Sequence, residues 1–390
     1  MRTYQLQDFA NPISVAVTNP SQSGYSRFVG LEHYDSGELV VKRYSGTELL
    51  TTTAKAFETN DILIARRNVY LKRAGIVFFD GITSGDTIVL RIKNDCESAT
   101  GVPKDLAQRI IPIVLNSEHF WIYANKHADG MNSKRISKEM LLTYEFDLPS
   151  LEEQRVLADK LWAAYEVKES YKNLLAQTDK LLHAQFEKMF GDPRKNDKQW
   201  DIKKMGEVFT IERGGSPRPI TEYLTDAPEG LNWIKIGDAG EGEKYITSTK
   251  EKIKPEGLKK TRLVHKGDFL LSNSMSFGRP YILDIDGCIH DGWLVLHDNY
   301  QTFDKSYLYY FLSTPELYEQ FKTLAAGGVV NNLNSDIVKK VEIIIPPLEM
   351  QLEFVSIAEQ AERTKASLNK GIEAIEAVIR SLIAEGTTKV

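Results

Sequence analysis

Apolar residues in the middle of the chain recur with the spacing of an amphipathic α-helix. Between residues 151 and 190 they are separated mostly by three or four positions, with one interruption at Lys168. This spacing predicts a helix of about 40 residues, which is roughly 60 Å long at 1.5 Å per residue. The face consists of Leu157, Leu161, Tyr165, Tyr171, Leu175, Thr178, Leu182, Phe186 and Met189.

Both ends of this segment carry helix-boundary residues. Ser150 occupies the expected N-cap position and Glu153 follows three residues later, which is the pattern of a capping box. Residues 191–193, Gly-Asp-Pro, end the helix, because glycine commonly follows the last helical turn and proline cannot continue it. A helix over residues 151–190 and a linker over residues 191–199 are therefore predicted.

A second long helix is predicted over residues 348–385, followed by a short tail at 386–390. Its apolar residues alternate in steps of four and three, which is the seam of a coiled coil. They are Leu368, Ile372, Ile375, Ile379 and Leu382. A whole domain separates the two helices in sequence, so we expect them to pair antiparallel. The alternative is that each helix packs on its own domain, but a helix of roughly 60 Å is longer than a domain of that size is wide.

The start of each long helix belongs to a repeated pattern. Residues 144–154 and 341–351 each contain an apolar, β-like run that ends in proline, followed by Leu-Glu-x-Gln. The copies are 197 residues apart (144 and 341), about half of the 390-residue chain. Solenoid repeats are far shorter, roughly 20–50 residues. The chain is therefore expected to contain two copies of one module, a globular domain followed by a helix.

Strand-like runs separated by turns fill residues 1–150 and 200–347. They lie at 27–31, 61–65, 75–79 and 87–92 in the first segment, and at 232–236, 268–272, 281–285 and 292–296 in the second. Residues 60–64 match 267–271, and 80–82 match 286–288, in the same order. The predicted fold class is α+β, with two mixed α/β domains joined by two long helices that form an antiparallel coiled coil.

Composition restricts the class of protein. The chain is 42% hydrophobic and 26% charged, as in folded soluble proteins. No run approaches the roughly 18 apolar residues that span a membrane, and the first residues lack the apolar region of a secretory signal. Cys96 and Cys288 lack metal-ligand spacing, so we expect two core thiols in a reducing cytoplasm.

Catalytic motifs are not found. The sequence has no G-x-x-x-x-G-K-[ST] phosphate loop and no H-E-x-x-H pattern. Asp284 and Asp286 flank the end of a predicted strand and are expected to lie in a turn. Pro346-Pro347 follows Ile345, and so differs from the Asp/Asn-Pro-Pro-aromatic signature of amino methyltransferases. We expect that the chain catalyses nothing alone and holds neither cofactor nor metal.

Basic and polar residues beside predicted turns are candidates for DNA contact. Net charge is −5, but residues 194–266 carry 16 Lys/Arg against 12 Asp/Glu, which favours binding through particular faces. Arginine pairs with guanine and asparagine with adenine, while serine is less selective. The candidates are Arg66, Arg67, Lys72 and Arg73 in the first segment, and Arg213, Ser216, Arg218, Asn273, Ser274 and Arg279 in the second.

Residues 213–218 are further expected to form a flexible loop whose free backbone amides suit phosphate contacts, and residues 259–262 are expected to act likewise. Residues 272–279 occupy the place in the second copy that residues 66–73 occupy in the first. The alternative for each cluster is a solvated loop. Residues 331–334 form either a polar DNA-contacting loop or the N-cap of a short helix, and the cap is preferred.

This layout resembles the specificity subunit of Type I restriction–modification enzymes. The resemblance rests on the repeated Pro-x-Leu-Glu-x-Gln and on four phrases: FEKMFGDP at 186–193, RGGSP at 213–217, PEGL at 255–258 and GDFLLS at 267–272. It covers essentially the whole chain. The first segment has an abbreviated opening and lacks the Arg-Gly-Gly phrase, so its loop geometry is expected to differ.

The resemblance implies that each globular segment is a target recognition domain that binds one half of a bipartite site in double-stranded DNA. The helices would set the spacer and dock two modification subunits, which bind S-adenosylmethionine and methylate adenine. A restriction subunit that uses ATP and Mg would complete the complex, and this chain would be its non-catalytic, cytoplasmic subunit. Two alternatives stay open: the specificity part of a single-chain restriction–methylase, and a coiled-coil scaffold that does not bind DNA.

Overall fold

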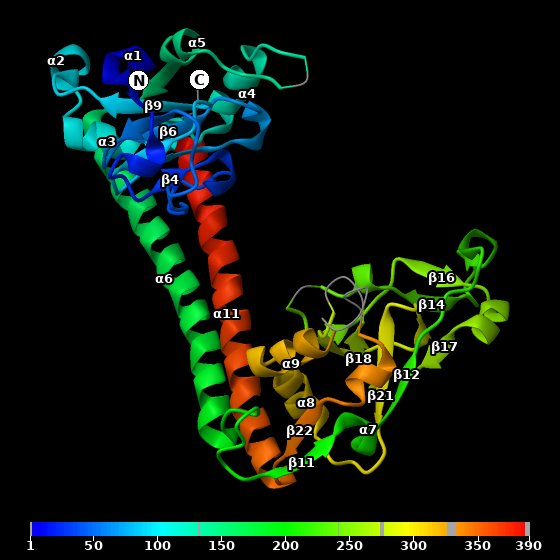
Figure 1. Cartoon of the computed structure of the whole chain (residues 1–390). Coiled ribbons are helices and arrows are strands. Elements are labelled where there is room, and N and C mark those ends of the chain that lie inside the picture. Colours follow the sequence, from blue (N-terminus) through cyan, green and yellow to red (C-terminus); the bar gives the residue numbers. More distant parts are fainter. Residues whose placement is uncertain (1, 132, 241, 274–276, 326–332, 387–390) are drawn as a thin grey trace. The chain divides into compact units, whose positions relative to one another are not determined.

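The chain forms two compact units. The computed structural model describes all residues except 1, 132, 241, 274–276, 326–332 and 387–390. Unit 1 comprises Met1–Asn173 and Leu368–Val390, and unit 2 comprises Leu174–Ser367. Each unit contains one globular module and about half of each long helix, α6 (Leu151–Phe190) and α11 (Leu348–Gly386) (Figure 1).

The first module precedes α6 and contains two four-stranded sheets, β2-β9-β6-β7 and β3-β5-β8-β4, and the pair β1-β10. Its strands are β1 (Arg2–Gln5), β2 (Ala10–Ile13), β3 (Val15–Val17), β4 (Phe28–Val29), β5 (Ala54–Phe57), β6 (Ile62–Ala65), β7 (Ala74–Ile76), β8 (Gly81–Thr83), β9 (Thr87–Ile92) and β10 (Glu145–Leu148). Its α-helices are α1 (Leu6–Phe9), α2 (Cys96–Thr100), α3 (Lys104–Val114), α4 (Glu118–Lys126) and α5 (Lys138–Leu142).

The second module lies between α6 and α11 and contains two five-stranded sheets, β12-β21-β18-β19-β15 and β13-β16-β14-β20-β17, and the pair β11-β22. Its strands are β11 (Asp201–Lys204), β12 (Phe209–Arg213), β13 (Leu224–Thr225), β14 (Leu231–Ile234), β15 (Tyr245–Ile246), β16 (Glu251–Ile253), β17 (Arg262–Val264), β18 (Phe269–Ser272), β19 (Pro280–Leu283), β20 (Gly287–Ile289), β21 (Trp293–Asp298) and β22 (Glu342–Ile345). Its α-helices are α7 (Met205–Val208), α8 (Lys305–Leu312), α9 (Pro315–Ala325) and α10 (Ser335–Val338).

The two modules repeat one topology. The order β2-β9-β6-β7 in the first corresponds to β12-β21-β18-β19 in the second, and the parallel pair β4-β8 corresponds to β14-β20. The second module adds β15 and β16 between β14 and β17, whereas the residues between the equivalent β4 and β5 form no strand. The internal repeat expected from the sequence is thus present in the strand pairing.

Hydrogen bonds in two turns are repeated as well. An aspartate at the start of β6 or β18 and another before β8 or β20 each accept a bond from a backbone amide. At the first position, Glu58 N donates to Asp61 Oδ2 in the first module and His265 N donates to Asp268 Oδ2 in the second, both at 2.8 Å. At the other position, Thr59 N donates to Asp80 Oδ1 at 2.8 Å and Lys266 N donates to Asp286 Oδ1 at 2.7 Å. The matched segments 60–64 with 267–271 and 80–82 with 286–288 are therefore structural equivalents.

The long helices begin and end as their boundary residues predict. Ser150 and Glu153 form the capping box, with Ser150 N donating to Glu153 Oε2 at 2.9 Å. Gly191 follows α6 with φ +77 and donates its N–H to Glu187 O at 2.8 Å, as expected for a glycine C-terminal to a helix. Helices α6 and α11 pack antiparallel and side by side (Figure 1).

Both helices contribute to the core of unit 1. Leu161 and Tyr165 of α6 are buried together with Ile379 and Ile383 of α11 in the hydrophobic core of the first module. Helix α11 follows the second module in sequence, so its burial here excludes the alternative in which each helix packs only on its own domain.

The one interruption in the apolar pattern of α6 is a buried ion pair. The Lys168 side chain is 6% exposed, its Nζ lies 2.7 Å from Glu38 Oε2, and it is 4.0 Å from Glu376 of α11. Lys172 also pairs with Glu38 at 3.1 Å. Burial opposes ionisation of Glu38, but the bonds and charges of the two lysines outweigh it and lower the pKa of this carboxyl. A buried lysine is tolerated only because it is paired.

Unit 2 is built in the same way. Phe186 and Phe190 near the end of α6 are buried with Phe354 near the start of α11, and the Phe186 and Phe354 rings meet edge to face at 5.3 Å. The Tyr307 ring of α8 lies 5.0 Å from Phe190. Aromatic rings at both helix ends therefore complete the core of the second module.

The glutamine of the repeated motif anchors each long helix to its module. The side-chain amide of Gln154 donates to Pro149 O, and that of Gln351 donates to Pro346 O, each at 2.9 Å. Gln351 Oε1 also accepts from the backbone N–H of Asp304, the N-cap of α8, at 2.9 Å. The equivalent N-cap of α3 is Pro103, which has no N–H, and Gln154 Oε1 is buried without a partner among the described residues.

The sequence missed several elements. It indicated the strands β4, β6, β7, β9, β14, β18, β19 and β21 with small shifts, and the β-like runs at β10 and β22, but neither the remaining strands nor the helices α3, α4, α8 and α9. Cys96 and Cys288 are free and buried, as predicted. Asn334 caps α10 by accepting from Ile337 N, while residues 331–332 lie outside the described part. No helix in the described residues combines the length and apolar character of a membrane span.

Replacing Pro103 by aspartate is expected to stabilise the first module. Aspartate at this N-cap would satisfy α3 amides as Asp304 does in α8, and its N–H could pair with the orphaned Gln154 oxygen. A cap contributes about 0.5–2 kcal/mol, typically about 1, and loss of proline costs about 0.4–1 kcal/mol, so the net gain is about 0.5 kcal/mol. Hydrogen exchange of the α3 amides in the full chain measures this gain. Pro103→Ala restores the N–H without the cap, and slower exchange in that control than in Pro103→Asp would contradict the expectation.

Candidate nucleic-acid interface

The turn before the longest strand of each module gathers basic side chains. We call these the acidic turns, residues 84–86 (Ser-Gly-Asp) before β9 and residues 290–292 (His-Asp-Gly) before β21. In both turns, the backbone carbonyl of the residue two positions before the strand accepts a hydrogen bond from a cationic side chain. Lys55 Nζ donates to Gly85 O and Arg213 Nε donates to Asp291 O, each at 2.8 Å.

Asp291 is the centre of the second acidic turn. Its carbonyl oxygen also accepts from Asn273 Nδ2 at 3.0 Å, and its carboxylate accepts from the Ser216 hydroxyl at 2.7 Å. The Arg213 guanidinium lies 4.0 Å from the carboxylate. Three of the residues predicted from the sequence, Arg213, Ser216 and Asn273, are therefore held by one aspartate.

The charge of Asp291 is stabilised by its surroundings. Burial opposes ionisation, but the Ser216 hydrogen bond and the positive charges of Arg213 and Arg218 lower the pKa of the Asp291 carboxyl. The carboxylate stays ionised near neutral pH and orients the arginines beside it. It also offsets part of their positive charge, so the turn presents positioned donors rather than a diffuse basic patch.

The backbone of the Arg-Gly-Gly phrase is not free, and that expectation is corrected. Gly214 donates its N–H to Trp293 O at 3.0 Å and Gly215 donates to Ile289 O at 3.1 Å. A Cβ on Gly214 would lie 2.3 Å from His290 O, and one on Gly215 would lie 2.5 Å from Lys260 O. The glycines are required by close backbone packing, and their amides are unavailable to phosphate.

His290 takes a defined tautomer. Its Nδ1 accepts the backbone N–H of Gly292 at 3.0 Å, so the proton of the neutral ring lies on Nε2, 2.9 Å from Asp291 Oδ1. Burial lowers the pKa of His290, with nearby cations adding to the effect and Asp291 opposing it.

The first acidic turn gathers arginines around Asp86. Its carboxylate lies 3.3 Å from Arg135 Nε and 3.8 Å from Arg67 Nη1. Burial lowers the pKa of Lys55, and the positive charges of Lys138 and Arg66 lower it further. Cations from three separate segments thus meet at this turn, although the first module lacks the Arg-Gly-Gly phrase.

The other DNA-contact candidates of the first module differ in their exposure and in the partners that they already have. Arg66 is half-buried, and its Nε has no partner among the described residues. The Arg73 guanidinium donates to the carbonyls of Leu31 and Arg67, at 2.9 and 3.0 Å, and so braces the loop. Lys72 pairs with Glu118. Arg67 is the exposed member of this group.

The remaining second-module candidates are also unequal. Asn273 is 2% exposed and so holds the turn rather than facing solvent. It follows β18 as Arg66 follows β6, and both donate their N–H to the acidic turn at 2.9 Å. Arg218 is exposed and Arg279 is half-buried, whereas Ser274 lies outside the described residues. Of residues 259–262, Arg262 pairs with Glu212 at 2.9 Å.

The sequence analysis missed Asp86, Asp291 and Arg135. Asp86 directly precedes the strand-like run predicted at 87–92, and Asp291 directly precedes the one predicted at 292–296. An available signal was the aligned repeat, in which an aspartate precedes the same strand in both modules. A basic residue that reaches the turn from elsewhere, such as Arg135, could not be found in this way.

One group of residues has the composition of a metal site. The ligand atoms of His183, Glu187 and Glu316 lie within 4.8 Å of one another. The two imidazole nitrogens face different carboxylates, Nδ1 toward Glu187 and Nε2 toward Glu316, each at 3.9 Å. Each imidazole nitrogen thus has its own carboxylate partner.

Several known proteins are similar to this chain in sequence. A family model described as "Type I restriction modification DNA specificity domain" matches residues 197–377. The chain is 30% identical over 182 residues to the specificity subunit S.HindORF215P of Haemophilus influenzae, covering 45% of each chain. It is 22% identical over 290 residues to the EcoBI specificity subunit of Escherichia coli, covering 67% of this chain and 61% of that one.

Another relative is the MjaIX specificity subunit of Methanocaldococcus jannaschii, 26% identical over 198 residues, which cover 49% of this chain. The match spans less than half of the length of that relative (44%) and of the Haemophilus relative (45%).

Solved structures share the fold over the full length of the chain. A chain described under "Structural basis underlying complex assembly and conformational transition of the type I R-M system" aligns with a TM-score of 0.60 and 20% identity, covering 99% of this chain and 97% of that one. The Type I restriction–modification S subunit from M. genitalium aligns with a TM-score of 0.55 and 13% identity, covering 100% and 96%. The fold is thus that of a two-module protein with a paired-helix connection.

Residues 197–377 thus match the Type I restriction–modification DNA specificity domain, and the chain is similar to specificity (S) subunits of such systems. The expected α+β fold with antiparallel long helices is confirmed.

Acidification is expected to destabilise the second module through His290. Its folded-state pKa is lowered, so the unfolded chain binds more protons once the pH falls through the ordinary histidine value of about 6.5. The free energy of unfolding should therefore decrease more between about pH 7.5 and about pH 5.5 in the wild type than in His290→Asn. Asparagine keeps an acceptor for Gly292 N. Denaturant titrations at both pH values measure the difference, and equal losses would disprove it.

Proposed function

We propose that this chain is the DNA-recognition subunit of a Type I restriction–modification complex, in which each module is a target recognition domain for one half of a bipartite site. The observation that carries the proposal is the acidic turn, which occurs at the same place in two copies of one fold and gathers arginines in both. Two diverged copies of a binding domain suit two different half-sites.

Arg67 and Arg213 are the residues we propose for base contact. Each is exposed, and each is oriented by an aspartate of its own module. A guanidinium held in this way can present two parallel donors to guanine, whereas an unconstrained one pays more conformational entropy. Arg66, Arg218 and Arg279 are proposed to contact DNA beside them. Lys72, Arg73, Ser216 and Asn273 are proposed to position the loops, and Ser274 is retained as a DNA contact from its sequence position.

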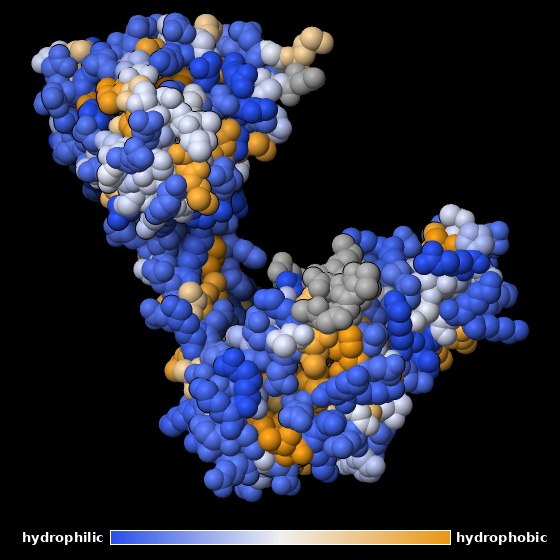
Figure 2. All heavy atoms as spheres, viewed as in Figure 1, coloured by the Kyte–Doolittle hydropathy of each residue, from blue (hydrophilic) through white to orange (hydrophobic). Residues whose placement is uncertain are grey.

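The helix pair is proposed to set the spacer and to dock the partner subunits. Several large apolar side chains stay exposed on it, and Figure 2 shows apolar atoms at the surface of the paired helices. Exposed apolar side chains that gather into a patch mark protein–protein contacts, and we propose that role for these. These side chains are Val156, Val167, Leu174, Leu181, Leu348, Leu352 and Val378.

The proposed partners are two modification subunits and one restriction subunit. The proposed complex acts in the cytoplasm and does not bind a membrane. The modification subunits would bind S-adenosylmethionine, and ATP and Mg would be used by the restriction subunit. Mapping methylated adenines in genomic DNA with and without this gene tests the proposal. A bipartite motif that disappears with the gene is expected, and an unchanged methylation pattern would overturn it.

Removing matched heptads from both helices is expected to shorten the spacer. Residues 172–178 and 365–371 face each other, since Tyr171 packs on Gly371 and Asp179 pairs with Lys365 at 2.9 Å. Deleting both segments keeps the seam in phase and removes about 10 Å, or about three base pairs. Methylated-site mapping should show both half-sites unchanged and a shorter spacer. An active variant with the original spacer would refute the proposed role of the helices.

Substituting Arg67 or Arg213 is expected to affect one half-site each. Arg67→Ala should relax recognition in the half bound by the first module, and Arg213→Ala in the other, at about 1–3 kcal/mol for a bidentate contact. Binding competition with DNA randomised in one half measures each effect. A loss that is equal across all sequences would instead identify the arginine as a phosphate contact.

A further inference from the structure

A pocket of about 690 Å³ opens beside the second acidic turn. Its volume lies within the range of about 300–1,000 Å³ that is usual for small-molecule sites. The pocket is bounded by the loop that follows the Arg-Gly-Gly phrase, the 3₁₀ turn Ile220–Glu222, strands β14 and β16, and His290.

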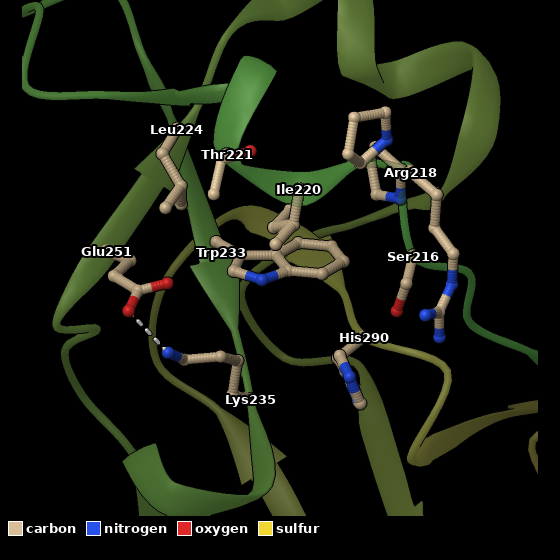
Figure 3. A pocket seen from close by; sticks show the side chains of 11 residues that line it. Ser216, Arg218, Ile220, Thr221, Leu224, Trp233, Lys235, Glu251 and His290 are labelled. Carbon is tan, nitrogen blue, oxygen red and sulfur yellow. Dashed lines mark ion pairs between the residues drawn. The ribbon is translucent and has the colours of Figure 1, made fainter.

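One wall of this pocket is apolar. Pro219, Ile220 and Leu224 line it, and the buried Trp233 lies behind them. Figure 3 shows the indole with Ile220 against one side and His290 on the other, and the His290 ring meets it edge to face at 5.7 Å and 70°. Such a wall accepts a flat, weakly polar ring better than a sugar or an ion.

The rest of the lining is polar, and one of its cations, Arg218, forms no hydrogen bond or ion pair with the described residues. Lys235 and Glu251 neutralise each other at 2.7 Å, and the lowered pKa of His290 keeps that ring neutral at physiological pH. The pocket therefore combines an apolar wall with a single available cation at its mouth.

We propose that this pocket binds one nucleotide, with the base against the apolar wall and the phosphate at Arg218. Proteins that take a base out of the stack hold it between aromatic or apolar side chains in this way. The nucleotide can come from two sources: an unstacked residue of bound DNA, or a free mononucleotide. The first source rests on the proposed DNA-recognition function, whereas the second does not.

Thr221→Trp is the variant that blocks the site. Thr221 is exposed and lines the pocket, so a tryptophan there fills the cavity without disturbing the core. Glu222→Trp is the matched control, since Glu222 lies in the same 3₁₀ turn but outside the lining. Arg218→Ala tests the phosphate contact separately.

The free-nucleotide test uses saturation-transfer NMR on the full chain with each of the four deoxynucleoside monophosphates. Transfer to base protons is expected with wild type and Glu222→Trp, and Thr221→Trp should weaken binding at least tenfold. Arg218→Ala should weaken binding of the monophosphates several-fold and leave binding of the corresponding nucleosides unchanged. Deoxyribose 5-phosphate, which lacks a base, should bind less well than any monophosphate.

The DNA test uses duplexes that carry the mapped site with 2-aminopurine at one position at a time. Unstacking of a base should change the fluorescence at one position of the half-site bound by the second module. Thr221→Trp should remove this change while Glu222→Trp keeps it, and duplex affinity is measured in parallel by gel shift.

A signal in either test that depends on Thr221 supports the nucleotide pocket and identifies its source. The pocket proposal is overturned if neither test gives a signal, or if the signals are the same in Thr221→Trp and wild type. Duplex binding without either signal would leave the proposed function standing. Nucleotide binding without duplex binding would support the pocket and contradict the proposed DNA-recognition function.

Discussion

Every other feature depends on the burial of both long helices in each globular core. Leu161 of α6 and Ile379 of α11 are buried in the first core, and Phe186 of α6 and Phe354 of α11 in the second. The first module buries its apolar face only together with the end of α11, which follows the second module in sequence. The domain that sequence continuity suggests, a module plus the helix after it, is therefore not the unit that packs. Each packing unit takes half of both helices.

The sequence revealed what depends on periodicity and little that depends on tertiary pairing. The long helices were predictable because spacings of three and four persist over many turns, and even the break at Lys168 corresponds to a buried ion pair with Glu38. Strand β8, Gly81–Thr83, was not, because three residues show no period. Its glycine is required by contact with Arg27 O, which a Cβ would approach to 2.8 Å. Such a constraint involves a distant residue and leaves no local pattern.

The candidate site shows the same division. Charged residues beside turns could be located from the sequence, but their environment could not. Asn273 looked like a base contact and is buried against Asp291, while the glycine amides of the Arg-Gly-Gly phrase are used by neighbouring strands. In both cases a backbone partner more than 15 positions away decides the outcome. The acidic turns emerge only when the strands of one sheet are paired and the two modules are compared.

The two modules share their cores and differ at their edges, which is what the proposed recognition of unlike half-sites would require. Equivalent aspartates hold equivalent turns, since Asp61 and Asp268 accept the same backbone bond at the same distance. The second module differs from the first by the strands β15 and β16 and by the Arg-Gly-Gly phrase. The first module differs by Arg135, which reaches its acidic turn from outside the sheet. Substitutions at these edges do not alter the helix anchors, because Gln154 and Gln351 contact backbone atoms of prolines at the helix starts. Specificity can therefore diverge in one module without destabilising the other.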